Sequence, residues 1–231
     1  MDSYRAALIG RNARETAYNI IRDKIINLEL RPGEPLSDKQ LAEELEMSRT
    51  PVREALIILS VSDMVLLKPQ TGTFVAPIDV ERMEIEQFAR FALEKEIISE
   101  VCKIGISKEI RWSYEENLRH YRHYAASTVP DRERRLLDLD NDFHGLAFQA
   151  CGRMRNHLLQ REQQQHIDRM RVLSLAIMDQ GVNTGDHVEL YEAISEKNSE
   201  RALTRLELHL NRYRDNLGLV RRTYPDYFTI G

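Results

Sequence analysis

Hydrophobic residues recur every three or four positions through most of the chain, which is the spacing of amphipathic helices. The first such stripe predicts a helix over residues 16–29, which the Arg31-Pro32-Gly33 sequence ends. Ser37 stands three residues before a glutamine, an arrangement that caps the start of a short second helix. Ser48 or Thr50 caps a third helix. The buried stripe of this third helix consists of Val52, Ala55, Leu56 and Leu59.

The pattern changes over residues 65–77, where two short β-prone runs flank Pro69-Gln70-Thr71-Gly72 and predict a hairpin. Three helices followed by a hairpin form one compact unit, which we place at residues 15–77. A polar leader, residues 1–14, comes before this unit, and a short linker, residues 78–80, comes after it.

The chain has helical periodicity throughout residues 81–222, and a tail, 223–231, follows. The first helix of this part is expected to bury a stripe of residues four apart: Ile85, Ala89, Leu93, Ile97 and Val101. The last three helices are expected at residues 155–179, 186–197 and 199–222. Gly181 and Gly185 are expected to end the first of these. About six helices with short connections predict an antiparallel bundle, so the fold class is mainly α.

Composition excludes several classes of protein. The 33 Lys and Arg residues against 37 Asp and Glu residues give a net charge of −4, which excludes an overtly basic nucleic-acid coat or a polybasic membrane binder. The longest apolar stretches fall far short of the roughly 18 residues that a membrane span requires. The N-terminus lacks the hydrophobic run of a secretory signal, and Cys102 and Cys151 are too few for a disulfide framework. We therefore expect a soluble cytoplasmic protein with no membrane partner.

Two arginines of the third helix are candidates for reading DNA. Arg49 and Arg53 lie one turn apart, on the face opposite Val52 and Leu56. Cations at a helix N-terminus are mildly unfavourable for the helix dipole, so helix stability does not call for them. In a major groove, however, arginine pairs bidentately with guanine, and Thr50 can reach a phosphate or a thymine methyl. Spacing alone leaves open that both arginines are solvated surface residues.

The stretch RPGEPLSDKQLAEELEMSRTPVREAL at residues 31–56, followed by TGTFV at 71–75, resembles the winged helix-turn-helix of the GntR family of bacterial transcription regulators. The resemblance covers roughly residues 15–77. The wing carries Gln70-Thr71 where many relatives carry Gly-Arg. The resemblance implies that five residues contact or approach operator DNA: Lys39, Arg49, Thr50, Arg53 and, in the wing, Gly72.

All seven histidines lie in the second half of the chain. Asp140 and His144 are four residues apart and therefore share a helix face with apolar side chains, and His187 and His209 also fall within apolar stripes. A lone histidine there would more often be a satisfied core residue, and a buried ionised aspartate needs a partner. Helical bundles also build metal sites from inward histidines and carboxylates, so these four residues are a candidate metal site. The other histidines are expected to be solvated or structural, notably His120, His123 and His157.

Three segments, at residues 137–152, 185–194 and 205–210, resemble the FCD effector domain of the FadR subfamily. In the metal-containing members, an Asp-x-x-x-His pair and two later histidines bind one divalent ion. The resemblance places these ligands on Asp140, His144, His187 and His209. One oxygen and three nitrogen ligands suit zinc or nickel.

The effector in this subfamily is typically a small organic acid that meets the metal and nearby cations. Arg90 matches a family arginine that faces this pocket; on helix geometry alone it is as readily a surface partner of Glu94. His166 is expected to line the cavity, and Arg169 and Arg171 are further candidates.

The sequence therefore predicts a homodimeric, ligand-responsive transcription regulator, most often a repressor in this family, and not an enzyme. A metalloenzyme is the main alternative, because an ion with an open position is also a catalytic design. This alternative does not explain the SRTPVREAL string. A metal-stabilised structural bundle that binds no ligand is a third interpretation. The effector, the metal, the operator and the sign of regulation cannot be read from the sequence.

Overall fold

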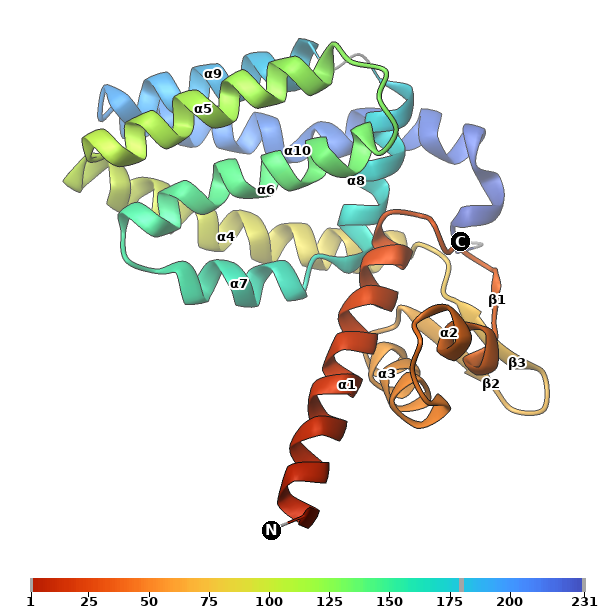
Figure 1. Cartoon of the computed structure of the whole chain (residues 1–231). Helices are drawn as coiled ribbons and strands as arrows, with labels where there is room; N and C mark the ends of the chain where they lie inside the picture. The colour runs from red at the N-terminus through yellow and green to blue at the C-terminus, as the bar shows by residue number, and fades with distance from the viewer. Residues whose placement is uncertain (1, 179–180, 230–231) are drawn as a thin grey trace. The chain divides into compact units, whose positions relative to one another are not determined.

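The computed structural model describes residues 2–178 and 181–229 and divides into two compact units (Figure 1). The first unit is Met1–Val80 together with Tyr224–Gly231, and the second is Glu81–Thr223. The tail is therefore grouped with the N-terminal unit. The described residues are mainly helical, as the periodicity predicts, and none of their helices is long and apolar enough to cross a membrane.

The first unit holds three helices and a small antiparallel sheet with the strand order β1-β3-β2. Its helices are α1 (Asp2–Ile26), α2 (Asp38–Glu44) and α3 (Arg49–Val61). Its strands are β1 (Pro35–Leu36), β2 (Val65–Lys68) and β3 (Gly72–Val75). The hairpin of β2 and β3 confirms the predicted wing. Strand β1 was not predicted, because two residues are too short for a periodic signal.

Helix α1 differs from the prediction at both ends. It begins at Asp2, so most of the expected polar leader is helical; that segment contains no proline and several good helix formers. It ends at Ile26 rather than at residue 29, because Leu28 adopts a left-handed conformation with φ 61°. The Arg31-Pro32-Gly33 sequence lies beyond the helix end.

The starts of α2 and α3 differ in their capping. The Ser37 hydroxyl accepts a hydrogen bond from the backbone N–H of Gln40 at 3.3 Å, which confirms the predicted start of α2. Ser48, rather than Thr50, occupies the N-cap position of α3, but its side chain makes no capping hydrogen bond. The apolar face of α3 is fully buried against α1, which leaves its opposite face exposed to solvent.

The chain segment after the wing is held by the tail. Tyr224–Thr229 includes a short 3₁₀ turn (Pro225–Tyr227) and then runs parallel to the linker. The Ile78 N–H donates to the Tyr227 carbonyl at 2.7 Å, and the Thr229 N–H donates to the Ile78 carbonyl at 3.0 Å. Because Ile78 and Phe228 are both buried, the linker is an ordered part of the N-terminal unit.

The second unit contains seven helices among its described residues, one more than expected. They are α4 (Val80–Ile104), α5 (Lys108–Ala125), α6 (Arg132–Ala150), α7 (Met154–Glu162), α8 (Gln165–Ile177), α9 (Gly181–Ser195) and α10 (Ser199–Thr223). In Figure 1, α4, α5, α6, α9 and α10 run lengthwise and α8 crosses them near one end. The predicted bundle is therefore confirmed.

The helix expected over residues 155–179 is two helices, because the chain breaks at Gln163-Gln164. No Gly or Pro marks this break. Instead, the Glu86 carboxylate of α4 accepts the backbone N–H groups of His166 and Ile167, both at 2.9 Å, and so caps the start of α8. Gly181 and Gly185 lie within α9 and do not end a helix, while residues 179–180 lie outside the described part.

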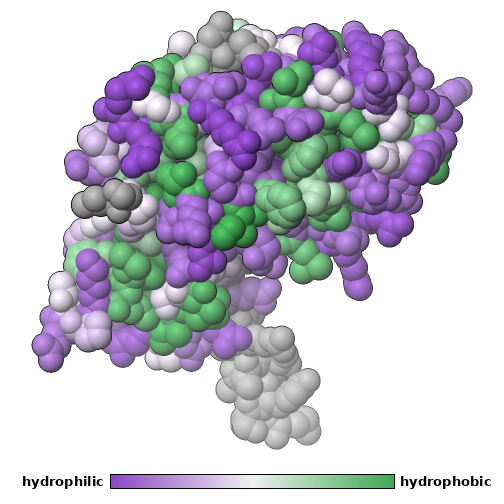
Figure 2. Space-filling view, turned by 180° about the vertical axis from the view of Figure 1, so that it is seen from behind, coloured by the Kyte–Doolittle hydropathy of each residue, from purple (hydrophilic) through white to green (hydrophobic). Residues whose placement is uncertain are grey.

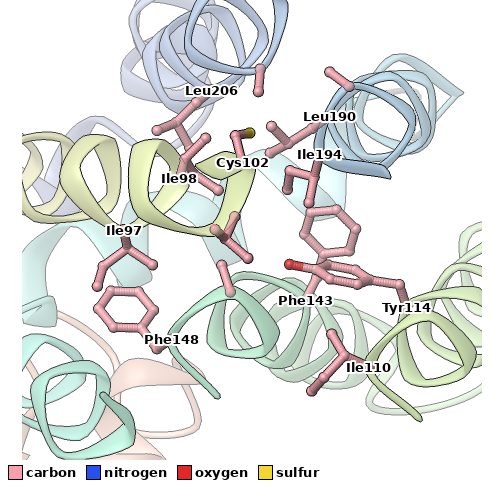
Figure 3. Close-up of a cluster of buried hydrophobic side chains, with 14 of the residues drawn as sticks. Ile97, Ile98, Cys102, Ile110, Tyr114, Phe143, Phe148, Leu190, Ile194 and Leu206 are labelled. Carbon is pink, nitrogen blue, oxygen red and sulfur yellow. The ribbon is translucent and has the colours of Figure 1, made fainter. Parts of the chain in front are cut away.

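The buried face of α4 also differs from the prediction. Ile85 is 58% exposed, and after the buried Met83 the next inward positions are polar: Gln87, Arg90 and Glu94. The predicted stripe holds only in the second half, where Ile97 and Val101 are buried. They join the hydrophobic cluster of Figure 3, in which the rings of Tyr114 and Phe143 meet edge to face with centroids 5.0 Å apart. One half of α4 therefore builds the core, and the other half faces a polar centre.

Candidate metal centre and DNA-binding face

Four buried side chains from three helices converge at the polar centre of the second unit. Asp140 and His144 come from α6, His187 from α9 and His209 from α10, and one ligand atom of each lies within 4.8 Å of the others. The Nε2 atoms of His187 and His209 lie 3.2 Å and 3.4 Å from Asp140 Oδ1, and His144 Nε2 lies 3.8 Å from Asp140 Oδ2. The four residues that the sequence marks by i,i+4 spacing or by a place in an apolar stripe thus lie together in the structure.

Two further carboxylates lie behind the histidines. Glu94 Oε2 is 2.7 Å from His144 Nδ1, and Asp186 Oδ2 is 3.6 Å from His209 Nδ1. A carboxylate at Nδ1 favours the tautomer that carries its proton there, which leaves Nε2 free to act as a ligand. The ring of His187 stacks on Phe143 with centroids 4.4 Å apart, which fixes the plane of that ring.

The charges of the centre follow from burial and pairing. Burial opposes ionisation of Asp140, but the charge of Arg171 and a hydrogen bond from His187 outweigh it and hold the pKa of Asp140 well below its usual range. Burial lowers the pKa of His187 to about 4 and also lowers the pKa of His144. At neutral pH Asp140 is therefore anionic and His144 and His187 are neutral, the forms in which these residue types bind metals. Burial opposes the charged form of His209, but hydrogen bonds to Asp140 and Asp186 outweigh it and raise the pKa of His209, so metal binding there competes with protonation.

The chemistry of these residues fits a borderline divalent ion. His144 Nε2 is buried, points into the cluster and has no hydrogen-bond partner among the described residues. A buried polar atom without a partner is costly, and an ion at the centre would satisfy it. One carboxylate oxygen and three imidazole nitrogens match zinc or nickel better than calcium or magnesium, which prefer all-oxygen sites.

A cavity of about 60 Å³ adjoins this centre, and Asp140 and His209 form part of its wall. Three arginines also line it: Arg90, Arg171 and Arg212. Further polar lining comes from Gln87, Tyr121, Ser174, Asn183, Tyr213 and Asn216. The cavity thus presents cations and neutral hydrogen-bonding groups next to the four converging side chains.

Only some of the residues that the sequence predicts to bind the effector line this cavity. Arg90 lines the cavity and is only 3% exposed; it does pair with Glu94, at 2.7 Å, but in the interior and not at the surface. His166 is not among the lining residues; its Nδ1 lies 2.9 Å from the Arg169 guanidinium. Of the two further candidates, Arg171 lines the cavity and Arg169 does not.

The remaining histidines do not approach the centre. His120 and His123 are exposed on α5. His157 is buried against α6, where a Cβ at Gly145 would lie 2.9 Å from its Nε2. These positions agree with the solvated and structural roles expected for them.

Sequence reasoning considered Glu94 only as a surface partner of Arg90, and it missed Asp186 and Arg212. Arg212 Nη2 donates to Asp186 Oδ1 at 2.7 Å, so one carboxylate touches both a cavity arginine and His209. A signal for Glu94 was present, since Gln87, Arg90 and Glu94 have helical spacing and form a polar face on α4. No such signal marks Asp186.

In the first unit, Lys39, Arg49 and Arg53 lie on an exposed face at the starts of α2 and α3, each with more than half of its side chain exposed. Thr50 is exposed in the first turn of α3. Both arginines contact Asp38: Arg49 Nη2 lies 2.7 Å from Oδ1, and Arg53 Nε lies 2.9 Å from Oδ2.

The wing forms a separate exposed element of this unit. Gly72 lies at its turn with φ 126°, a conformation that favours glycine. Its strand neighbour Lys68 places a cation on the wing, 5.2 Å above the Phe74 ring, which sequence reasoning did not single out.

The first unit has an exposed helix-turn-helix and a β2–β3 wing, and the same chain continues into a helical unit with a buried polar centre. These features define the class: a winged-helix transcription regulator with a second, all-helical domain. The family model "Bacterial regulatory proteins, gntR family" matches residues 13–75, and the FCD domain model matches residues 87–212. The chain belongs to the GntR family of bacterial transcription regulators and carries an FCD domain.

Its relatives are similar over nearly their whole length. An uncharacterised HTH-type transcriptional regulator from an unstable DNA locus of Streptomyces ambofaciens is 30% identical over 95% of this chain and 91% of that protein. The HTH-type transcriptional repressor RspR of Escherichia coli is 25% identical over 92% of each chain. These relatives are regulators and not enzymes, so the metalloenzyme alternative is wrong.

Solved structures show the same fold at low identity. E. coli McbR/YncC superposes with a TM-score of 0.74 at 16% identity, over 92% of this chain and 98% of that one. A putative GntR transcriptional regulator from Rhodococcus sp. RHA1 gives a TM-score of 0.66 at 23% identity, over 89% and 97%. These likenesses show that the fold of this chain occurs in solved structures.

Proposed function

We propose that this regulator, a member of the FadR subfamily, senses a small organic acid through a metal-containing FCD domain. The observation that carries the proposal is the convergence of Asp140, His144, His187 and His209 beside a cavity lined by arginines. These four residues hold one zinc or nickel ion per chain, which, when bound, supplies a Lewis-acidic position for an oxygen of the ligand.

The cavity sets the size and charge of the effector. A water molecule needs roughly 10–15 Å³ of such space, so about 60 Å³ admits only a small ligand. A carboxylate suits the three arginines of the wall, because their planar donor groups match it bidentately. Each arginine already pairs with an internal carboxylate, so the effector exchanges with one of these partners. Arg212, the most exposed of the three, is the first to be reached.

DNA recognition belongs to the first unit. Arg49 and Arg53 read base edges in the major groove, Lys39 and Thr50 contact the backbone, and the wing with Gly72 follows the minor groove. The linker at residues 78–80 connects the two units, and an effector changes operator affinity only as far as it favours one arrangement of the winged units over another.

The active form is a homodimer that binds a near-palindromic operator in the cytoplasm. Hydrophobic and polar side chains are interspersed over the surface in Figure 2. The helical unit, residues 81–222, dimerises, and its large exposed hydrophobics available for a subunit contact include Phe88, Trp112, Leu158 and Leu159. Repression is the proposed sign of regulation, since RspR is named a repressor.

Elemental analysis tests the metal site. Protein loaded with zinc or nickel and then desalted is expected to retain about one ion per chain, and His187→Ala/His209→Ala is expected to retain none. The matched control is His120→Ala/His123→Ala, which removes two exposed histidines and keeps the ion. Equal metal content in the wild type and His187→Ala/His209→Ala would show that the four residues are ordinary core polar groups.

A second measurement tests effector sensing. Small carboxylates are added one at a time to the loaded protein while the midpoint of thermal unfolding and operator affinity are followed. The proposal predicts that at least one acid raises the midpoint and shifts operator affinity, and that His187→Ala/His209→Ala loses the response. A loaded protein that responds to none of them would instead be a structural, metal-stabilised bundle.

A further inference from the structure

Asp38 is an acidic residue in the middle of a face that should bind a polyanion. It is the first residue of α2, and its side chain is only 20% exposed because the two arginines of α3 cover it. Each oxygen receives one arginine: Oδ1 receives Arg49 and Oδ2 receives Arg53, whose Nη2 is also within 2.7 Å. A single carboxylate thus holds both proposed base-reading side chains.

This arrangement has two consequences for binding. First, an unpaired arginine loses rotamer freedom on docking, and a guanidinium already fixed by a carboxylate loses less. Second, the negative charge of Asp38 opposes the phosphates of any sequence alike, and it reduces the number of free cations that can attach to them. The hydrogen bond from Arg49 and the nearby guanidinium charges lower the pKa of Asp38, so the carboxylate is ionised at neutral pH.

We propose that Asp38 is a specificity-determining, positioning residue, which aims Arg49 and Arg53 at base edges and keeps them from binding phosphates non-specifically. The inference rests on the proposed DNA-reading role of the two arginines. The alternative is a purely structural role, in which Asp38 links α2 to α3 and stabilises the fold. The two roles predict different changes in the affinity for specific DNA relative to random DNA.

The test compares Asp38→Asn with Glu43→Gln. Both changes remove one negative charge from α2, but Glu43 touches neither arginine and only approaches Lys39, at 3.9 Å. A binding site is first selected from random duplexes with the wild-type protein. Affinities for this duplex and for a scrambled duplex of the same length are then measured by fluorescence anisotropy between 50 and 200 mM salt.

Asp38→Asn is expected to bind the scrambled duplex more tightly and to lower the ratio of specific to random affinity about tenfold, which corresponds to about 1.4 kcal/mol. Its salt slope on the scrambled duplex is expected to steepen by about one, as a released arginine takes up a phosphate contact. Glu43→Gln is expected to raise both affinities by a similar factor and to keep the ratio.

Two outcomes would overturn the proposal. An unchanged ratio in Asp38→Asn, with the unfolding midpoint of the wild type, would mean that the carboxylate does not direct the arginines. An unchanged ratio that results from equal losses on both duplexes, together with a lower unfolding midpoint, would assign Asp38 a structural role only. Arg49→Ala/Arg53→Ala separates the premise from the inference: if that variant keeps the wild-type ratio, the arginines do not read bases. If it loses the ratio while Asp38→Asn keeps it, only the inference about Asp38 fails.

Discussion

Replacing Glu94 by glutamine is the sharpest perturbation of the polar centre that the structure offers. Glu94 is 2% exposed, and its Oε1 accepts hydrogen bonds from Arg90 at 2.7 Å and from Gln160 at 2.9 Å. Its Oε2 lies 2.7 Å from His144 Nδ1. Glutamine keeps the volume and one acceptor oxygen but removes the charge and brings an NH₂ group. The change therefore tests the carboxylate itself and not the packing around it.

The substitution is expected to lower both the free energy of unfolding and the affinity for the metal. Breaking a buried ion pair leaves Arg90 without its nearest counter-charge, which typically costs about 3–5 kcal/mol. Asp140, at 3.5 Å from Arg90, compensates for part of this, so we expect a loss of about 2–4 kcal/mol in the free energy of unfolding of the metal-free protein. A carboxylate behind a ligand histidine typically contributes a factor of about 10–100 to metal affinity, and we expect a loss in this range.

Urea unfolding of the metal-free protein measures the first effect, and zinc or nickel competition with a chelator measures the second. Glu100→Gln is the matched control, because Glu100 pairs with Arg153 at the surface and such pairs contribute about 0–1 kcal/mol. If Glu94→Gln unfolds with the wild type and also binds the metal equally well, the assigned roles of this carboxylate are wrong. A loss of stability with unchanged metal affinity would limit Glu94 to the fold.

Three further predictions concern other parts of the chain. Arg53→Ala should cost roughly 1–3 kcal/mol on a selected binding site and much less on random DNA; equal losses would assign it to phosphates alone. Burial raises the pKa of Glu86 to about 7 from 4.5, so the stability that its protonated form contributes is present below about pH 4.5 and is lost as pH rises through 7. The unfolding free energy of the wild type, relative to Glu86→Gln, should therefore fall between pH 5 and pH 8, and a flat difference would contradict this. Phe228→Ala should cost about 3–5 kcal/mol in unfolding of the N-terminal unit, since Phe228 is buried beside Ile78, whereas Tyr224→Ala should cost little.

Much of the fold could be predicted because it rests on local physics. Helical periodicity depends on residues three and four apart, and the Ser37 cap depends on residues within one turn, so both are visible in the sequence. The i,i+4 pair Asp140 and His144 is local in the same sense. His187 and His209 could be grouped with this pair only through the family resemblance, since spacing does not say that α6, α9 and α10 meet at one point.

Other features could not be predicted because they depend on contacts between distant segments. The break between α7 and α8 has no sequence signal, since the group that caps α8 is Glu86, about 80 residues earlier. The apolar stripe of α4 does not predict that its polar residues are buried. That burial is explained only by contacts with other helices, such as the contact between Glu94 of α4 and His144 of α6. Strand β1 exists only because β3 pairs with it.

The sequence by itself determined the class of the protein: helices from periodicity, a hairpin from its turn residues, and the family from two motif-bearing regions. Only the tertiary structure decided which partner each charged group has. Asp38 holds both arginines of α3, Asp186 joins a cavity arginine to His209, and Ile78 is bound by the tail. The physical reason is that charge pairing acts through space, and burial strengthens it, so sequence separation carries no information about it.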